Sequence, residues 1–203
     1  MDSQVEKALA KWPNVPHCYG WLALDAQGSW RMRDEHAQRN GSIGERITQS
    51  SLIGFIQRNY MPDERGHWYF QNGPQRVYVE LQAAPYIARI EPEMKLMLHT
   101  SQPMSDLDAA FLSDNGNLWL CGEKRVAMLD GRDLVHCLPL LNIDGKTIDD
   151  AALHAWMNST GTCGQLTLTW QDTAIPVGYL LELQAPERFG FVHSPRAQPA
   201  DST

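Results

Sequence analysis

A short stretch of the chain gathers side chains that could bind a ligand. Residues 76–81 alternate polar with apolar side chains, which is the period of a β-strand whose two faces differ. The polar face carries Arg76, Tyr78 and Glu80, and Gln71 and Asn72 lie just before it. An arginine can hold an oxyanion through two parallel hydrogen bonds. These five are the candidate ligand-binding residues, on a surface that is either open to solvent or the wall of a cleft between structural units.

Four widely spaced cysteines offer a second kind of chemistry. Cys18 directly follows a histidine, and Cys163 lies in a turn flanked by glycines, so these two are the candidate reactive thiols. A nucleophilic cysteine needs a pKa lowered by a neighbouring histidine or a helix N-terminus. The sequence leaves open whether either thiol has such a neighbour.

Motifs for metal, cofactor and acyl-transfer chemistry are missing from the sequence. Zinc sites typically use cysteines or histidines two to five positions apart, whereas this chain has only the adjacent pairs at residues 17–18 and 136–137. It has neither a G-x-S-x-G elbow nor a phosphate-binding loop. We therefore predict no metal, no cofactor and no identifiable catalytic residue.

Composition and charge limit the classes of protein to which this chain can belong and the compartment expected for it. The 203 residues carry a net charge of −7, and 43% of them are hydrophobic, the balance of a globular protein with a sizeable core. No cluster of basic residues predicts nucleic-acid binding, and no apolar run predicts a membrane span. With no secretory signal, reduced thiols and a cytoplasmic location are expected.

One sequence segment is found twice. The run Val-Glu-Leu-Gln-Ala-Ala-Pro that contains Glu80 returns as Leu-Glu-Leu-Gln-Ala-Pro around Glu182, a shift of 102. Helix-forming segments near residues 50 and 150 match at a shift of 101, and Trp30 matches Trp119 at a shift of 89. Agreement in order and spacing predicts an internal duplication. At the shift of 102, a leucine stands in the place of Tyr78, so a site peculiar to one copy would lie at Arg76 and Tyr78.

Hydrophobic periodicity and turn residues predict the elements that position these residues. Helices are expected at residues 4–11, 48–59 and 147–158, and a loop at residues 33–45. Hairpins are expected at residues 19–33 and 68–82, at a type I′ turn formed by Asn115-Gly116, and at residues 166–183. Two further strands are expected at residues 86–90 and 95–99.

This order of elements predicts the α+β class. We expect two similar β-rich units, each consisting of a hairpin, a helix, a second hairpin and a strand in antiparallel sheets. The first unit spans residues 1–100 and the second spans residues 109–193. Residues 101–108 are the predicted linker, and residues 194–203 are a predicted disordered tail.

Three segments of the chain resemble an uncharacterised proteobacterial family of unknown function. They read WPNVPHCYGWLALD at residues 12–25, FQNGPQRVYVEL at residues 70–81 and RFGFVHSP at residues 188–195. The resemblance covers nearly the whole chain. The order of hairpin, helix and second hairpin also resembles, more distantly, another uncharacterised bacterial family with two structural repeats. That resemblance implies a duplicated fold similar to pleckstrin-homology domains and a signalling role, and neither resemblance implies a catalytic residue.

Three classes of function follow from these observations. The favoured hypothesis is a non-catalytic module that binds a small molecule or a protein partner, in regulation or signalling. The first alternative is an enzyme with a cysteine or carboxylate site between the two units. The second alternative is a scaffold or dimerisation protein. The sequence identifies neither the ligand nor the partner.

Overall fold

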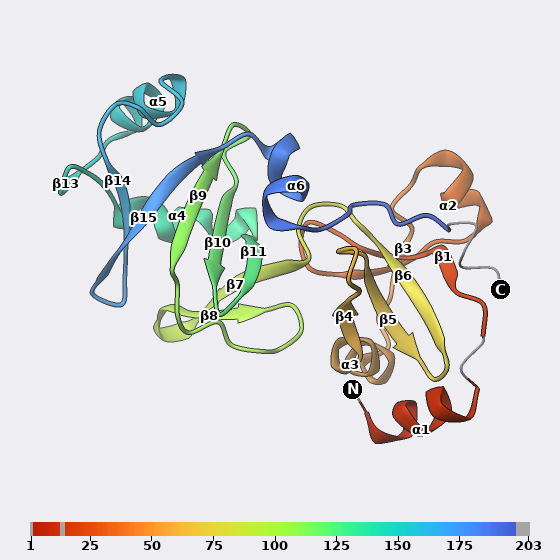
Figure 1. Ribbon diagram of the computed structural model, residues 1–203. Helices are drawn as coiled ribbons and strands as arrows, with labels where there is room; N and C mark the ends of the chain where they lie inside the picture. The colour runs from red at the N-terminus through yellow and green to blue at the C-terminus, as the bar shows by residue number, and fades with distance from the viewer. Residues whose placement is uncertain (1, 13–14, 198–203) are drawn as a thin grey trace. The chain divides into compact units, whose positions relative to one another are not determined.

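The chain forms two compact units. The computed structural model describes residues 2–12 and 15–197. Unit 1 consists of Met1–Pro85 together with Phe189–Thr203, and unit 2 consists of Tyr86–Arg188. Figure 1 shows the blue C-terminal segment leaving α6 and running back along the strands of unit 1. Each unit has its own sheet and its own core.

Unit 1 is built on a six-stranded sheet in the order β3-β2-β1-β6-β5-β4. Its elements are α1 (Ser3–Lys11), β1 (Cys18–Leu24), β2 (Trp30–Met32), α2 (Glu35–Asn40), β3 (Glu45–Arg46), α3 (Ser50–Arg58), β4 (Tyr60–Pro62), β5 (Trp68–Asn72) and β6 (Gln75–Leu81). All neighbouring strands are antiparallel except the central pair of β1 and β6. A parallel pair needs a long crossover connection, and the connection from β1 to β6 contains α2, α3 and the strands β2 to β5.

Helix α3 covers one face of this sheet. Phe55 of the helix lies edge-on to Phe70 of β5, with ring centroids 5.3 Å apart. Ile56, on the next position of the helix, is buried. The helix ends at Asn59, whose side-chain amide donates to the carbonyl oxygen of Phe55 at 2.9 Å. Figure 1 shows α3 beside β4 and β5.

Unit 2 is built on a nine-stranded sheet in the order β13-β12-β14-β15-β9-β10-β11-β7-β8. Its strands are β7 (Tyr86–Glu91), β8 (Lys95–Leu98), β9 (Ala109–Ser113), β10 (Leu118–Gly122), β11 (Arg125–Leu129), β12 (Leu141–Ile143), β13 (Lys146–Thr147), β14 (Leu166–Trp170) and β15 (Thr173–Leu180). Its helices are α4 (Leu134–Cys137), α5 (Asp150–Asn158) and α6 (Ala185–Phe189), with 3-10 turns η1 (Pro92–Met94), η2 (Gly131–Asp133), η3 (Leu138–Leu140) and η4 (Glu182–Gln184). The α+β class predicted from the sequence is confirmed.

A large buried cluster of unit 2 joins residues of several strands and helices between Ala88 and Val177. Ala110 of β9, Ala127 of β11 and Leu168 of β14 are fully buried in one cluster with Trp156 of α5. The indole N–H of Trp156 donates to the carbonyl oxygen of Gly164 at 3.3 Å, so the large side chain keeps a hydrogen bond inside the core. Burial of such side chains from several strands and a helix provides the apolar area that stabilises the unit.

Both sheets are mixed rather than antiparallel. The predicted hairpins all form, but parallel pairs join β1 to β6, β9 to β15 and β7 to β11. Each parallel pair joins strands that are far apart along the chain. Turn residues predict only the pairing of strands that follow one another, so the sequence did not show these contacts.

The two sheets contain the same run of six strands. The order β4-β5-β6-β1-β2-β3 in unit 1 corresponds to β12-β14-β15-β9-β10-β11 in unit 2, with the same directions throughout. The register agrees as well. Phe70 pairs with Val77 in unit 1, and Leu168 pairs with Ile175 in unit 2, which fixes a shift of 98 for the second hairpin. One difference is that β4 follows its helix, whereas β12 precedes α5.

The first hairpins of the two units also correspond, at a shift of 88. Gly28 and Gly116 occupy the same turn position with φ of 78° and 79°. Their N–H groups donate to the carbonyl oxygens of Asp25 and Ser113 at 3.0 and 2.8 Å. Asn115 does not have a positive φ, so its turn is not the predicted type I′, which needs positive φ at both central residues.

The repeated Glu-Leu-Gln-Ala segment does not mark equivalent positions. Glu80 lies in β6, whereas Glu182 begins the turn η4 after β15 has ended. At the structural shift of 98, Glu80 corresponds to Gly178 and Tyr78 corresponds to Pro176. The sequence comparison that set a leucine against Tyr78 is therefore wrong by four residues. The shared topology supports an internal duplication, which remains our inference.

The units divide at a different place from the one predicted. The predicted linker at residues 101–108 lies within unit 2, where Met104 is buried and its N–H donates to the carbonyl oxygen of Leu96 at 3.0 Å. The polar composition of this segment suggested a linker, but its backbone is fixed against β8. The last residues of the predicted second unit, from Phe189 onward, belong to unit 1.

One short helix lies where a loop was expected. Residues 33–45 contain α2, and the side chain of Asp34 caps it by accepting the N–H of Ala37 at 2.7 Å. Gly41 ends the helix with φ of 67°, a left-handed conformation that glycine adopts without a steric penalty. The Asp34 and Gly41 signals were present in the sequence, but six helical residues give too few turns for a recognisable apolar period.

Candidate functional site

The predicted ligand-binding residues do not form one site. Gln71 is fully buried, and its side-chain amide donates to the carbonyl oxygen of the turn glycine at 2.9 Å, so it shapes the β5–β6 hairpin. The other residues separate between the two faces of the sheet. Asn72 lines an apolar pocket, Arg76 lines a polar hollow, and Glu80 holds the C-terminal segment.

The apolar pocket lies on the face of the sheet that carries α3 and has a volume of about 290 Å³. Eight of its ten lining residues are hydrophobic, and the other two are Cys18 and Asn72. Trp21 and Met32 are 42% and 46% exposed and stand at its opening. The hydrophobic lining residues are Trp21, Leu22, Met32, Ile47, Leu52, Ile56, Phe70 and Val77.

An irregularity in β1 explains how this pocket forms. Cys18 is opposite Val77 of β6, and Leu22 is opposite Val79, so four steps along β1 match two steps along β6. Extra residues of this kind bend a strand and redirect its side chains. As a result, the consecutive residues Trp21 and Leu22 both line the pocket, although regular alternation would place them on opposite faces.

The polar hollow lies on the other face of the same hairpin and has a volume of about 500 Å³. It is lined by the end of β4 and the following turn, together with Tyr69 of β5 and Arg76 of β6. The guanidinium carbon of Arg76 lies 4.7 Å from the centroid of the Tyr69 ring, a cation–π contact. Burial lowers the pKa of Arg76, but its interactions with Tyr78 and Tyr69 outweigh burial and raise it, so the group is charged.

A buried layer supports this hollow from beneath. Tyr78 is only 1% exposed and stacks on Tyr19, with ring centroids 4.5 Å apart, and its hydroxyl donates to Oδ2 of Asp63 at 3.2 Å. Asp63 also accepts the backbone N–H groups of Arg65 and His67, each at 2.9 Å. Burial raises the pKa of Asp63, but these hydrogen bonds outweigh burial and hold it below its ordinary value. Tyr78 therefore acts as a structural support rather than as a surface ligand contact.

Glu80 fixes the C-terminal segment to unit 1. Its Oε2 accepts the hydroxyl of Ser194 at 2.5 Å, and its Oε1 accepts Nη1 of Arg196 at 2.5 Å. The N–H of Leu81 donates to the carbonyl oxygen of His193 at 2.8 Å in the same region. Residues 194–197 of the predicted disordered tail are thus held in place, and residues 198–203 lie outside the described residues.

Of the two candidate cysteines, Cys18 lacks the surroundings of a nucleophile. Cys18 lines the apolar pocket, and burial raises its pKa. Cys163 is exposed in its turn, where its N–H donates to the hydroxyl of Ser159 at 3.1 Å. Burial also raises the pKa of Cys121 to about 11 and that of Cys137 to about 12. A raised pKa keeps a thiol protonated and unreactive at neutral pH.

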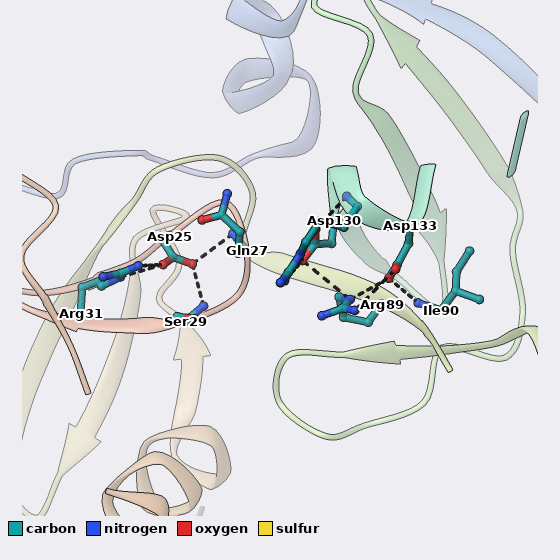
Figure 2. A network of polar contacts seen from close by, with 9 residues as sticks. Asp25, Gln27, Ser29, Arg31, Arg89, Ile90, Asp130 and Asp133 are labelled. Carbon is teal, nitrogen blue, oxygen red and sulfur yellow. Dashed lines mark hydrogen bonds and ion pairs between the residues drawn. The ribbon is translucent and has the colours of Figure 1, made fainter. Parts of the chain in front are cut away.

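Figure 2 shows a polar network of unit 2 around Arg89 and Asp133. Oδ2 of Asp133 accepts Nε of Arg89 at 2.7 Å and the N–H of Ile90 at 2.9 Å. Neighbouring Asp130 accepts the side chain of Arg132, and both carboxylates are buried. The network joins β7 to the end of β11, so its role is structural.

The second network in Figure 2 belongs to the first hairpin of unit 1. Oδ1 of Asp25 accepts the N–H groups of Gln27 at 3.0 Å and Ser29 at 2.7 Å, and its Oδ2 accepts Nε of Arg31 at 2.7 Å. An aspartate that receives its own turn's N–H groups is a standard way to close a β-turn. This buried carboxylate is therefore fully used by the fold.

Sequence reasoning missed most of the residues that line the two hollows. Trp21, Met32 and Leu52 lie in the hairpin and helix predicted at residues 19–33 and 48–59, and hydrophobic periodicity cannot show that a core is incompletely filled. Asp63 and Arg65 lie between that helix and the hairpin predicted at residues 68–82, where no element was expected. Their one available signal was their position directly before the Trp68 strand, which makes them neighbours of the hairpin that carries Arg76.

Comparison with known sequences identifies the family. The family DUF2944, described as "Protein of unknown function (DUF2946)", matches residues 1–196. The chain belongs to this family. Among curated proteins, none matches the chain. The predicted resemblance to a family of unknown function is confirmed.

A solved structure of another family shares the fold. A DUF1285 family protein from Silicibacter pomeroyi DSS-3 is 12% identical with a TM-score of 0.50, and the match covers 93% of this chain and 100% of that chain. A DUF1285 family protein from Shewanella baltica OS155 is 13% identical with a TM-score of 0.41, over 61% of this chain and 91% of that chain. At this identity the first match shows a common fold of the DUF2944 chain and that protein.

Two further features bear on the classes of function considered above. Within residues 2–12 and 15–197, no group of three or more His, Cys, Asp or Glu side chains could hold a metal ion. Among the described helices, none has the length and apolar character to cross a membrane.

Proposed function

We propose that unit 1 is a binding module for a small, uncharged and largely apolar molecule, and that the apolar pocket beside α3 is its binding site. The observation that carries this proposal is a pocket of about 290 Å³ with eight hydrophobic lining residues. Protein interiors are close-packed, and voids larger than a water molecule are few. This hollow is open to solvent beside Trp21 and Met32, and a concave lining that is mostly apolar with few polar groups is typical of small-molecule sites.

The size and lining of the pocket define the class of ligand. Its volume is about twice that of an engineered 150 Å³ cavity that binds benzene in another protein. None of the described residues that line it is charged, so a charged group inside it would lose its hydration without compensation. Asn72 offers one amide that can orient a hydroxyl or carbonyl group of the ligand. A two-ring aromatic compound or a short alkyl chain with one polar end has these properties.

The surroundings of the cysteines favour binding over cysteine catalysis. Among the described residues, Cys18 is the only thiol in the pocket lining, and burial raises its pKa. A nucleophilic role would need the opposite shift. We therefore place Cys18 among the apolar contacts of the ligand.

Thermal-shift measurements with a series of neutral probes test this function. Naphthalene, indole and 1-octanol should each stabilise the protein, because a ligand that binds only the folded state raises its melting temperature. The uncharged dye N-phenyl-1-naphthylamine should become fluorescent on binding and be displaced by these compounds. If none of these probes stabilised the protein, the proposal would be contradicted.

A pocket-filling variant supplies the matched comparison. Val77→Phe places a ring in the pocket from β6, and it should reduce dye binding at least tenfold while the protein stays folded. Val126→Phe is the control, since Val126 is also half-buried on a strand but belongs to unit 2 and does not line the pocket. Equal dye binding by the Val77→Phe variant and the control would show that the dye binds elsewhere.

A further inference from the structure

The polar hollow on the opposite face of the β5–β6 hairpin is a second concave site, distinct from the apolar pocket. Its lining contains two guanidinium groups, Arg65 and Arg76, and two carboxylates, Asp63 and Glu64. Its volume of about 500 Å³ is within the range of small-molecule sites. The charge that the hollow presents to a ligand therefore depends on which of these four groups already interact with other residues of the protein.

Asp63 is fully engaged by the protein. Its carboxylate accepts the backbone N–H groups of Arg65 and His67 and the hydroxyl of Tyr78. Its Oδ2 also lies 3.5 Å from Nε of Arg65. A carboxylate with this many donors stays ionised, and most of its hydrogen-bonding capacity is taken up by the protein itself.

Arg76 is engaged differently. One face of its guanidinium rests on the Tyr69 ring, and no salt bridge to a carboxylate is formed by Arg76 within the part of the chain that the structure describes. Stacking of this kind fixes the plane of a guanidinium, whose N–H groups lie along its edge, and Tyr78 interacts with one part of that edge. Tyr69 is itself only 5% exposed, so the plane is supported by a rigid surface.

We propose that this hollow binds a small organic phosphate, with Arg76 as the principal contact. A phosphate presents oxygens in the geometry that an arginine edge binds bidentately. Arg65, on the facing turn, adds positive charge. Glu64 is an exposed carboxylate in the lining, where it can accept hydrogen bonds from hydroxyl groups of the ligand. Glycerol 3-phosphate and ribose 5-phosphate combine these features, whereas inorganic phosphate offers the anion alone.

Isothermal titration of the full chain tests the site with three probes. Ribose 5-phosphate should bind most tightly, inorganic phosphate more weakly, and ribonate, a carboxylate of similar size, most weakly. Affinity for ribose 5-phosphate should fall as salt is added, because the attraction is electrostatic. Failure of both phosphates to bind, or tighter binding of ribonate, would overturn the proposal.

Substitution of Arg76 separates binding from folding. Arg76→Gln should weaken ribose 5-phosphate binding by about tenfold to a hundredfold, since hydrogen bonds to charged groups are the stronger ones. Arg76→Lys keeps the charge but loses the bidentate edge, so a smaller loss is expected. Arg46→Gln, at an exposed arginine of β3 outside the hollow, should bind like the unmodified chain.

The binding result for the Arg76 variants can be interpreted even if the substitutions change the stability of the protein. Circular dichroism melting of each variant shows whether the Arg76 variants remain folded, and the neutral dye of the apolar pocket reports independently on the fold of unit 1. Unchanged phosphate affinity in folded Arg76→Gln protein would show that the arginine serves only to pack against Tyr69.

Discussion

His99 is the residue whose surroundings predict a measurable response to pH. Its Nδ1 accepts the N–H of Ile87 at 3.2 Å, and its Nε2 is buried. Burial lowers the pKa of His99 to about 3, well below its ordinary value of 6.5. In the folded chain the ring therefore stays neutral at pH values where the unfolded chain takes up a proton.

The direction of the pH effect follows from this difference. The unfolded chain binds the additional proton below about pH 6.5, so the free energy of unfolding should fall as pH decreases from 6.5 toward 3. The loss should be at most about 1.4 kcal/mol per pH unit, the limit for one proton. Urea unfolding between pH 7 and 4.5 should show this slope in the unmodified chain and a shallower one in His99→Gln.

The control is a histidine without burial. His36 is exposed on α2 and exchanges a hydrogen bond with Asn40, so His36→Gln should keep the slope of the unmodified chain. Identical slopes in His99→Gln and the unmodified chain would show that His99 titrates normally.

At the scale of elements, the C-terminal segment depends on one close backbone approach. Gly66 has φ of 76°, and a Cβ atom at this position would come within 2.3 Å of the carbonyl oxygen of Gly190. The N–H of Val192 also donates to the carbonyl oxygen of Gly66 at 3.1 Å. Gly66→Ala should therefore detach residues 190–197 from unit 1, and amide exchange at Val192 should accelerate at least tenfold.

Substitution of a second glycine distinguishes the effect of backbone strain from the effect of a steric clash. Gly41 has a similar φ of 67°, and none of the described atoms lies within 4 Å of the place that a Cβ would take, so Gly41→Ala suffers the strain alone. Strain of this kind costs roughly 1 kcal/mol, and overpacking adds about 1–3 kcal/mol more. Exchange at Val192 should be unchanged in Gly41→Ala. Equal effects of the two substitutions would mean that the clash is relieved without moving the segment.

The elements themselves were largely predictable, whereas their contacts were not. Hairpins such as β5–β6 were found because their turn residues and alternation are local signals. The parallel pairing of β1 with β6 was not, because it joins residues more than fifty positions apart and leaves no local pattern. The polar hollow could be predicted only in part for the same reason. Arg76 was identified from the alternation along its strand, but Asp63 and Tyr69 become its neighbours only when the strands pair in the sheet.

The repeat illustrates how local likeness can mislead. The Glu-Leu-Gln-Ala segments share four residue types, yet the first begins at the end of β6 and the second begins the 3-10 turn η4. The correspondence between the strand registers of the two hairpins, at a shift of 98, sets Phe70 against Leu168 and Val77 against Ile175, which share only their apolar character. Cross-strand register conserves burial rather than identity, so a search for identical residues found the wrong alignment.

At the scale of the whole molecule, the division into units predicts which parts fold alone. Unit 2 is continuous along the chain, and its buried cluster, from Ala88 to Val177, lies entirely within Tyr86–Arg188. Unit 1 needs both ends of the chain, because Glu80 and Leu81 are joined to Ser194 and His193. The fragment 86–188 should therefore fold cooperatively by circular dichroism, whereas the fragment 1–85 should be less stable than the same unit in the full chain.

Addition of a peptide of residues 189–203 to the fragment 1–85 should raise its melting temperature, since the peptide restores these hydrogen bonds. A peptide with Ser194 and Arg196 replaced by alanine is the matched control, and equal stabilisation by both peptides would show that the contacts to Glu80 do not hold the segment.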